Sequence, residues 1–167
     1  MESILRELRQ PEYLHTLLNP VPVYGLALGL FGLLIGLLQR NRGGQVVALA
    51  IVFVSALSAW PVYALGERGF DRVLTLTDDD GRAWLEEHER RGEQLIIAFY
   101  ALALVSGAAL AIPWKWPQTA TPFSLFVLVA GILVVAIGSY IAHAGGKIRH
   151  REFRTGAPPG LKQSVPE

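Results

Sequence analysis

Four long stretches without a charged residue constrain this chain more than any other feature. They cover residues 22–39, 46–65, 94–113 and 123–144, and none contains Asp, Glu, Lys or Arg. A helix rises 1.5 Å per residue, so about 20 residues cross the roughly 30 Å hydrocarbon core of a bilayer. Because backbone groups cannot stay unpaired in lipid, each stretch is expected to be a helix. The sequence therefore predicts an all-α integral membrane protein with four transmembrane helices.

The connecting segments predict how these helices are arranged. Short links after the first and third stretches favour two hairpins and hence an antiparallel bundle. The longer link, residues 66–93, contains Thr77 followed by three Asp residues, which is typical of a helix start with Thr77 as the cap. We expect short interfacial helices before the first and third spans, and a break near Pro61. Residues 1–150 are expected to form one transmembrane domain, and residues 151–167 a disordered tail.

Glycine is regularly spaced in two of the spans. Four glycines between residues 25 and 36 form one stripe along the first helix, and Gly131, Gly138 and Gly145 recur every seven residues along the fourth. Small residues in such stripes let membrane helices approach closely, which is the plainer interpretation. The alternative is that these glycines leave space for a flat cofactor.

Composition excludes several classes of function. The net charge is only +1, so no nucleic-acid partner is expected, and there is no cysteine. Disulfides, thiolate metal sites and iron–sulfur clusters are thereby excluded. No ionisable residue except His143 lies within the spans, which argues against an ion pathway. No catalytic motif is present either, so we do not expect an enzyme.

Histidine is the residue type in this chain that is best suited to bind a cofactor or a metal ion. His15, His88, His143 and His150 all fall on the side of the membrane that carries the N-terminus. Such a group is a candidate cofactor site for b-type haem or a metal ion, with Gly92 giving room four residues after His88. The alternative is four interfacial histidines that bond to nearby backbone or carboxylate groups.

Three local motifs carry a resemblance to a known family. They are HTLLNPVP at residues 15–22, HERRG at residues 88–92 and HAGG at residues 143–146. In this order they resemble a widespread family of bacterial four-helix membrane proteins classed as a domain of unknown function. Its members have a His-Pro-rich motif before helix one, a His before helix three and a GHxGG-like motif at the end of helix four.

This chain differs from the family pattern at three places in these motifs. Pro20 replaces the second His of the opening motif, Ala142 replaces a Gly, and residues 147–150 replace an aromatic-containing stretch. The resemblance implies the four-helix fold and its topology, and some family members occur beside or fused to redox proteins. It implies no known reaction.

Basic residues predict the orientation. Twelve of the fifteen Lys and Arg residues lie on the side of the N-terminus, the long link and the tail. The positive-inside rule favours the cytoplasm for that side, in a bacterial inner membrane. We expect an accessory or anchoring subunit of a membrane assembly, an electron-transfer assembly under the haem hypothesis. Its expected partners are the lipid bilayer and other membrane or redox subunits. The alternatives are a cofactor-free structural or lipid-interacting protein and, with less support, an enzyme or transporter for a lipid-soluble substrate.

Overall fold

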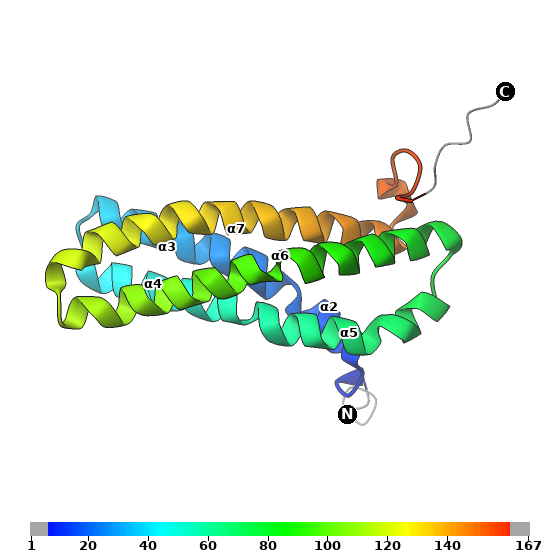
Figure 1. The fold of residues 1–167 in the computed structure, drawn as a ribbon, viewed down its shortest axis with the longest axis horizontal. Coiled ribbons are helices and arrows are strands. Elements are labelled where there is room, and N and C mark those ends of the chain that lie inside the picture. Colours follow the sequence, from blue (N-terminus) through cyan, green and yellow to red (C-terminus); the bar gives the residue numbers. More distant parts are fainter. Residues whose placement is uncertain (1–6, 161–167) are drawn as a thin grey trace.

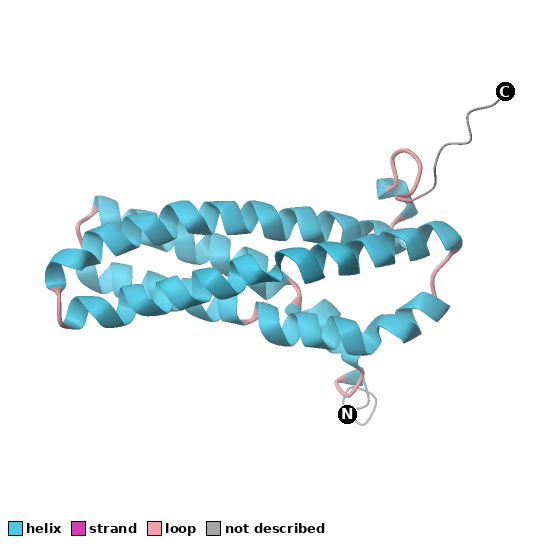
Figure 2. Cartoon of the chain, in the orientation of Figure 1, coloured by secondary structure: helices cyan, strands magenta, loops and turns pink. Residues whose placement is uncertain are grey.

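The computed structural model describes residues 7–160 as an antiparallel bundle of four long helical segments (Figures 1 and 2). No strand occurs within this part of the chain. The first segment runs through α2, a π-helical turn and α3, and the second through α4 and α5, while α6 and α7 are continuous. The elements are α2 Pro11–Leu18, the π turn Val21–Gly25, α3 Leu26–Leu38, α4 Arg42–Leu57, α5 Ala59–Thr75, α6 Asp79–Ala111 and α7 Ala120–Arg149.

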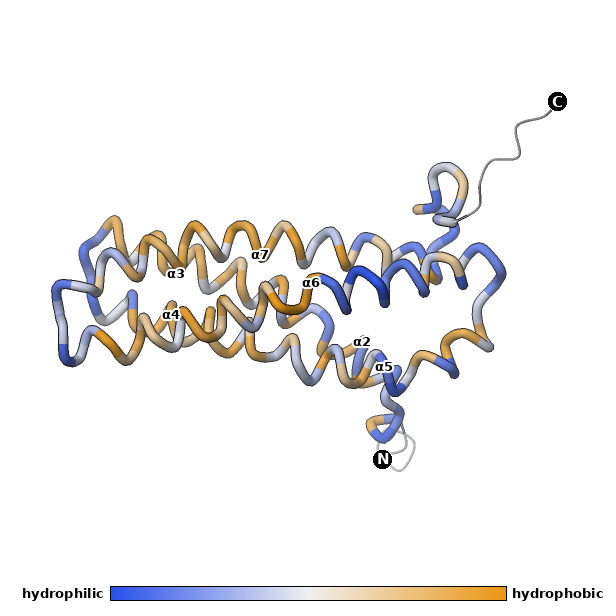
Figure 3. The backbone as a smooth tube through the Cα atoms, viewed as in Figure 1, coloured by the Kyte–Doolittle hydropathy of each residue, from blue (hydrophilic) through white to orange (hydrophobic). Residues whose placement is uncertain are grey.

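All four segments are long and apolar enough to cross a membrane, which confirms the four predicted spans. They contain 28, 34, 36 and 33 residues, whereas about 20 suffice for a bilayer. The extra turns lie at the end of the bundle that holds both termini, where Figure 3 shows hydrophilic residues along the first half of α6. Large apolar side chains such as Leu28, Phe31 and Leu104 point outward along the remaining length. The chain is therefore a multi-pass membrane protein.

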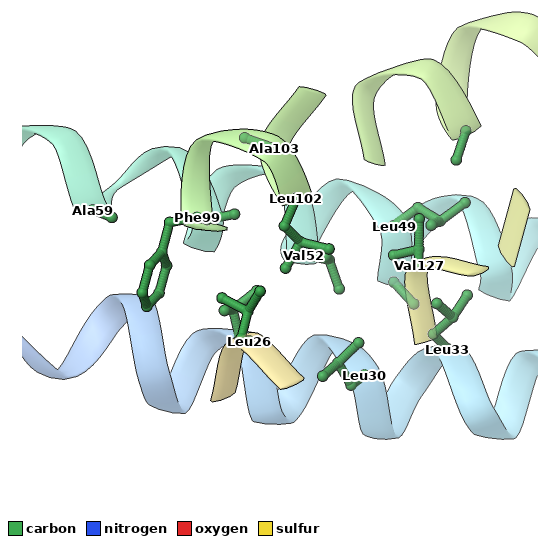
Figure 4. Packing of buried hydrophobic residues seen from close by; sticks show 14 residues of the cluster. Leu26, Leu30, Leu33, Leu49, Val52, Ala59, Phe99, Leu102, Ala103 and Val127 are labelled. Carbon is green, nitrogen blue, oxygen red and sulfur yellow. The ribbon is translucent and has the colours of Figure 1, made fainter. Parts of the chain in front are cut away.

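The first glycine stripe packs α3 against α4, as the sequence predicts. A Cβ on Gly29 would lie 3.0 Å from the backbone nitrogen of Val52, and one on Gly36 would lie 3.0 Å from that of Gln45. Around this contact, Leu26, Leu30 and Leu33 of α3 meet Leu49 and Val52 of α4, with Phe99 and Leu102 of α6 beside them (Figure 4). This close packing fixes the end of the bundle that carries the short links.

Two prolines break the helices at the other end. Pro22 has no N–H to donate to the carbonyl of Leu18, and α2 ends at Leu18. Pro61 likewise cannot donate to Leu57, the last residue of α4. Beyond these breaks α2 and α5 pack on each other and diverge from α6 and α7 (Figure 1). The predicted break at Pro61 is confirmed.

Both the expected helix cap and the expected tail differ from the structure. Asp78, not Thr77, caps α6, because its Oδ1 accepts a 3.0 Å hydrogen bond from the Gly81 N–H. The tail predicted to be disordered from residue 151 begins with the 3₁₀ turn Arg151–Phe153. Arg154 then donates to the carbonyls of Lys147 and Ile148, at 2.8 and 2.7 Å, and so satisfies the end of α7. Residues 161–167 of the predicted tail lie outside the described residues.

Candidate cofactor site

His15 and His88 lie opposite each other where the two halves of the bundle diverge. Their ring centroids are 6.1 Å apart and their planes are inclined by 80°. His15 comes from α2 and His88 from the first part of α6, so each half of the bundle supplies one imidazole. The two histidines lie 73 positions apart in the sequence, and the fold brings their rings together in an edge-on arrangement.

The position of His15 is fixed by a carbonyl and a glycine on α5. Its Nδ1 lies 2.8 Å from the carbonyl oxygen of Val62. Gly66 stands one turn further along α5, and a Cβ there would lie 3.0 Å from the Cε1 and Nδ1 of the ring. The imidazole therefore reaches the carbonyl through the space that a side chain at residue 66 would fill.

His88 is held in the same way on α7. Its Nδ1 lies 3.0 Å from the carbonyl oxygen of Ile141, and a Cβ on Gly145 would lie 3.1 Å from the ring. In both halves, then, the first helix of a hairpin gives the histidine, and the second gives a carbonyl followed four residues later by glycine. The sequence does contain a signal for this arrangement, namely one helical glycine against each histidine. Which glycine lies against which histidine is visible only in the folded structure.

These hydrogen bonds determine the chemical state of both rings. A carbonyl oxygen can only accept, so Nδ1 must carry the proton in His15 and in His88. In the neutral imidazole the other nitrogen, Nε2, then has a free lone pair. A backbone carbonyl bonded to Nδ1–H is also the usual support of a metal-ligating histidine, because it fixes the ring and raises its basicity.

A cavity of about 760 Å³ adjoins the two imidazoles. Its wall is formed by α2, α5, α6 and α7 and is largely apolar, with Val62, Ile96 and Phe99 among its residues. Gly92 lines it as well. Cavities of roughly 300–1,000 Å³ are the usual size for small-molecule and cofactor sites.

Arg91 holds the His88 side of the site in place. It is buried in α6, and its Nη1 donates a 2.8 Å hydrogen bond to the carbonyl of Tyr140. Its guanidinium also lies 3.8 Å from the centroid of the Tyr140 ring, and its Nε lies 2.7 Å from Glu87. Arg91 and His88 thus bind consecutive carbonyls of α7, so α6 cannot slide along α7 without breaking both bonds. Sequence reasoning missed Arg91.

The other two predicted histidines do not join this pair. His143 is exposed on α7, and His150 is exposed beyond its end, where it bonds to Glu152 at 2.9 Å and stacks on Phe153. His143 lies two residues from Gly145, about 200° around the helix, and so faces away from His88. Across residues 7–160 no group of three or more His, Asp or Glu side chains could hold a metal ion. Of the four predicted histidines, the structure brings His15 and His88 together, while His150 lines the cavity at its outer end and His143 does not line it.

A charged link closes the end of the bundle beyond the cavity. Asp78, at the start of α6, lies 3.0 Å from Arg154 and 2.9 Å from Arg151. The hydrogen bond from Arg154, assisted by that from the Gly81 N–H, lowers the pKa of Asp78 to about 2. This link joins the start of α6 to the end of α7, the two helices that hold His88.

Comparison with protein-family models, with curated proteins and with solved structures finds no match to this chain. The fold itself defines its class, a multi-pass membrane protein built as an all-α four-helix bundle. Its most notable feature is a pair of carbonyl-anchored imidazoles beside a largely apolar cavity.

Proposed function

We propose that this chain is a membrane-bound b-type haem protein, in which His15 and His88 are the two axial ligands. One observation carries the proposal: both histidines direct Nδ1 to a carbonyl, which leaves Nε2 available, and their centroids lie 6.1 Å apart. Metal–imidazole bonds are about 2.0–2.1 Å long, so two imidazoles on opposite sides of one metal have centroids about 6.3 Å apart. The observed spacing agrees with that value.

The number of ligands favours haem over a bare metal ion. A structural zinc site needs about four protein ligands and a catalytic one about three. The pair here has no third partner among the described residues. A porphyrin brings four nitrogen donors of its own and needs only axial ligands from the protein. Two histidines from different helices, with room between the helices, satisfy that need.

The surroundings of the pair also fit a flat, largely apolar ring. Gly66 and Gly145 let each imidazole lie close to its supporting helix, which leaves the space between the helices to a ligand. The cavity walls include the apolar side chains of Val62, Ile96 and Phe99. Haem bound there would supply one-electron redox chemistry. The chain itself holds the two ligands in a fixed tautomer and shields the site with apolar residues.

In this account the protein is an accessory or anchoring electron-transfer subunit of the bacterial inner membrane. Its histidine end belongs to the side that carries the termini, proposed to be cytoplasmic because most basic residues lie there. The resemblance to the bacterial four-helix family supports the same assignment, since some members accompany redox proteins. Other redox subunits of the membrane are the proposed partners.

The visible spectrum of the detergent-solubilised protein, purified from haem-replete cells, tests the proposal. We expect a Soret band and, after reduction, the sharp α and β bands of a six-coordinate haem. His15→Ala and His88→Ala should each abolish the six-coordinate spectrum, whereas His143→Ala and His150→Ala should leave it unchanged. A colourless wild-type protein that also fails to take up added haemin would favour the alternative, a cofactor-free structural or lipid-interacting protein.

A further inference from the structure

The cavity has one polar end, and the charges there differ from those beside the imidazoles. Glu67 and Glu89 line it at the level of the histidines, since they follow Gly66 and His88 directly in sequence. Arg72 and Arg149 line it nearer the end of the bundle that holds the termini. The wall therefore carries Glu67 and Glu89 beside the imidazoles, and two arginines with one carboxylate, Glu12, toward the aqueous end.

Arg149 occupies the outer end of the α7 face that forms the wall. That face also carries Gly138, Ala142 and Gly145, at helical spacings of three or four residues. Arg149 is four residues beyond Gly145, about 6 Å further along the axis. No ion pair to Arg149 occurs among residues 7–160, so its guanidinium can bind an anion without losing a partner.

Arg72 lies on the opposite wall, on α5. Its Nε is 2.9 Å from a carboxylate oxygen of Glu12, and its side chain is 57% exposed. A guanidinium has five N–H donors, so Arg72 can bind a second carboxylate while it keeps this contact. Glu12 offsets part of its charge, and Arg72 should bind an anion less strongly than Arg149 does.

We propose that Arg149 and Arg72 bind the two propionate carboxylates of the haem, so that the anionic edge of the ring faces the end of the bundle that carries the termini. This inference rests on the proposed haem site. Arginine forms strong, often bidentate hydrogen bonds with carboxylates. In the reverse orientation the propionates would lie deeper in the bundle, away from both arginines and beside apolar residues such as Phe99.

Haemin and its dimethyl ester, whose carboxylates are blocked, test the assignment. The wild-type protein without haem is titrated with each porphyrin in one detergent, and the six-coordinate spectrum is recorded. We expect haemin to bind about tenfold more tightly or better, because each charge-assisted hydrogen bond contributes about one factor of ten. Arg149→Gln should remove most of this preference and leave the affinity for the ester unchanged, and Arg149→Lys should restore part of it. Arg72→Gln should have a smaller effect.

Arg68→Gln and Arg82→Gln are the matched controls, because both arginines are exposed at the same end and neither lines the cavity described for residues 7–160. Both should keep the full preference for haemin. Equal wild-type affinity for the two porphyrins, or the same preference in Arg149→Gln as in the controls, contradicts the propionate assignment alone. Failure of both porphyrins to bind the wild type contradicts the haem site and this inference with it.

Discussion

The imidazole of His88 packs so closely against Gly145 that a Cβ on residue 145 would lie 3.1 Å from the Nδ1 and Cε1 atoms of the ring. Gly145→Ala should therefore displace the ring from the Ile141 carbonyl and weaken haem binding by at least tenfold. Gly146 is its matched control, since a Cβ there would meet nothing closer than Phe153 at 4.0 Å. Gly146→Ala should keep haem and gain up to about 1 kcal/mol of helix stability. Haemin titration and thermal unfolding of both variants measure these effects. Equal haem affinity in the two variants would show that the glycine has no part in the site.

The glycine stripe on α3 gives a second matched pair, which tests the packing of the bundle. A Cβ on Gly29 would lie 3.0 Å from the backbone of Val52, whereas one on Gly32 would meet only the Cβ of Ala48, at 3.5 Å. We expect Gly29→Ala to destabilise the protein by about 1–3 kcal/mol, the usual cost of overpacking. Gly32→Ala should be neutral or slightly stabilising. Unfolding in mixed detergent–denaturant solutions compares them, and an equal stability of the two variants would contradict the close approach of α3 to α4.

The Asp78 link predicts a loss of stability in acid. Its folded-state pKa, about 2, lies below its ordinary value, so the carboxylate binds protons less readily in the folded protein. The stabilisation is therefore fully present above pH ~4 and is lost as the pH falls toward 2. Asp78→Asn keeps an oxygen that can cap Gly81 but removes the charge. It should unfold at a lower temperature than the wild type at pH 7.

The difference between Asp78→Asn and the wild type should shrink between pH 4 and pH 2, where the wild-type carboxylate becomes protonated. Asp79→Asn is the control, because Asp79 is exposed and makes no ion pair within residues 7–160. A difference that stays constant over this pH range would mean that the carboxylate charge does not stabilise the fold.

Much of the fold follows from the sequence, because lipid imposes simple rules on it. Four uncharged stretches of sufficient length had to form helices, and the short links had to make neighbouring helices antiparallel. Pro61 marked a real break for a local reason, the lost hydrogen bond to Leu57. The cap at Asp78 was displaced by one residue, because Thr and Asp are both good caps and only the chain path chooses between them.

The site was less predictable, because it depends on how two hairpins lie relative to each other. The sequence shows that all four histidines belong to one side of the membrane, but not which of them face the interior. His143 is exposed on α7 and faces away from His88, whereas His150 lies beyond the end of that helix and bonds to Glu152. The choice of His15 and His88 depends on carbonyls at Val62 and Ile141, and a carbonyl leaves no trace in the sequence. The glycines that follow these two carbonyls by four residues are visible in the sequence.

Electron paramagnetic resonance of the oxidised, haem-containing protein tests the central claim most directly, because the signal depends on the relative orientation of the two axial imidazoles. The planes of His15 and His88 are inclined by 80°. Nearly perpendicular imidazoles on a low-spin ferric haem give a highly anisotropic signal, and parallel ones give an ordinary rhombic signal. We predict the highly anisotropic low-spin signal, lost in both His15→Ala and His88→Ala. A high-spin signal from the wild type, or a low-spin signal that survives either substitution, would contradict ligation by this pair.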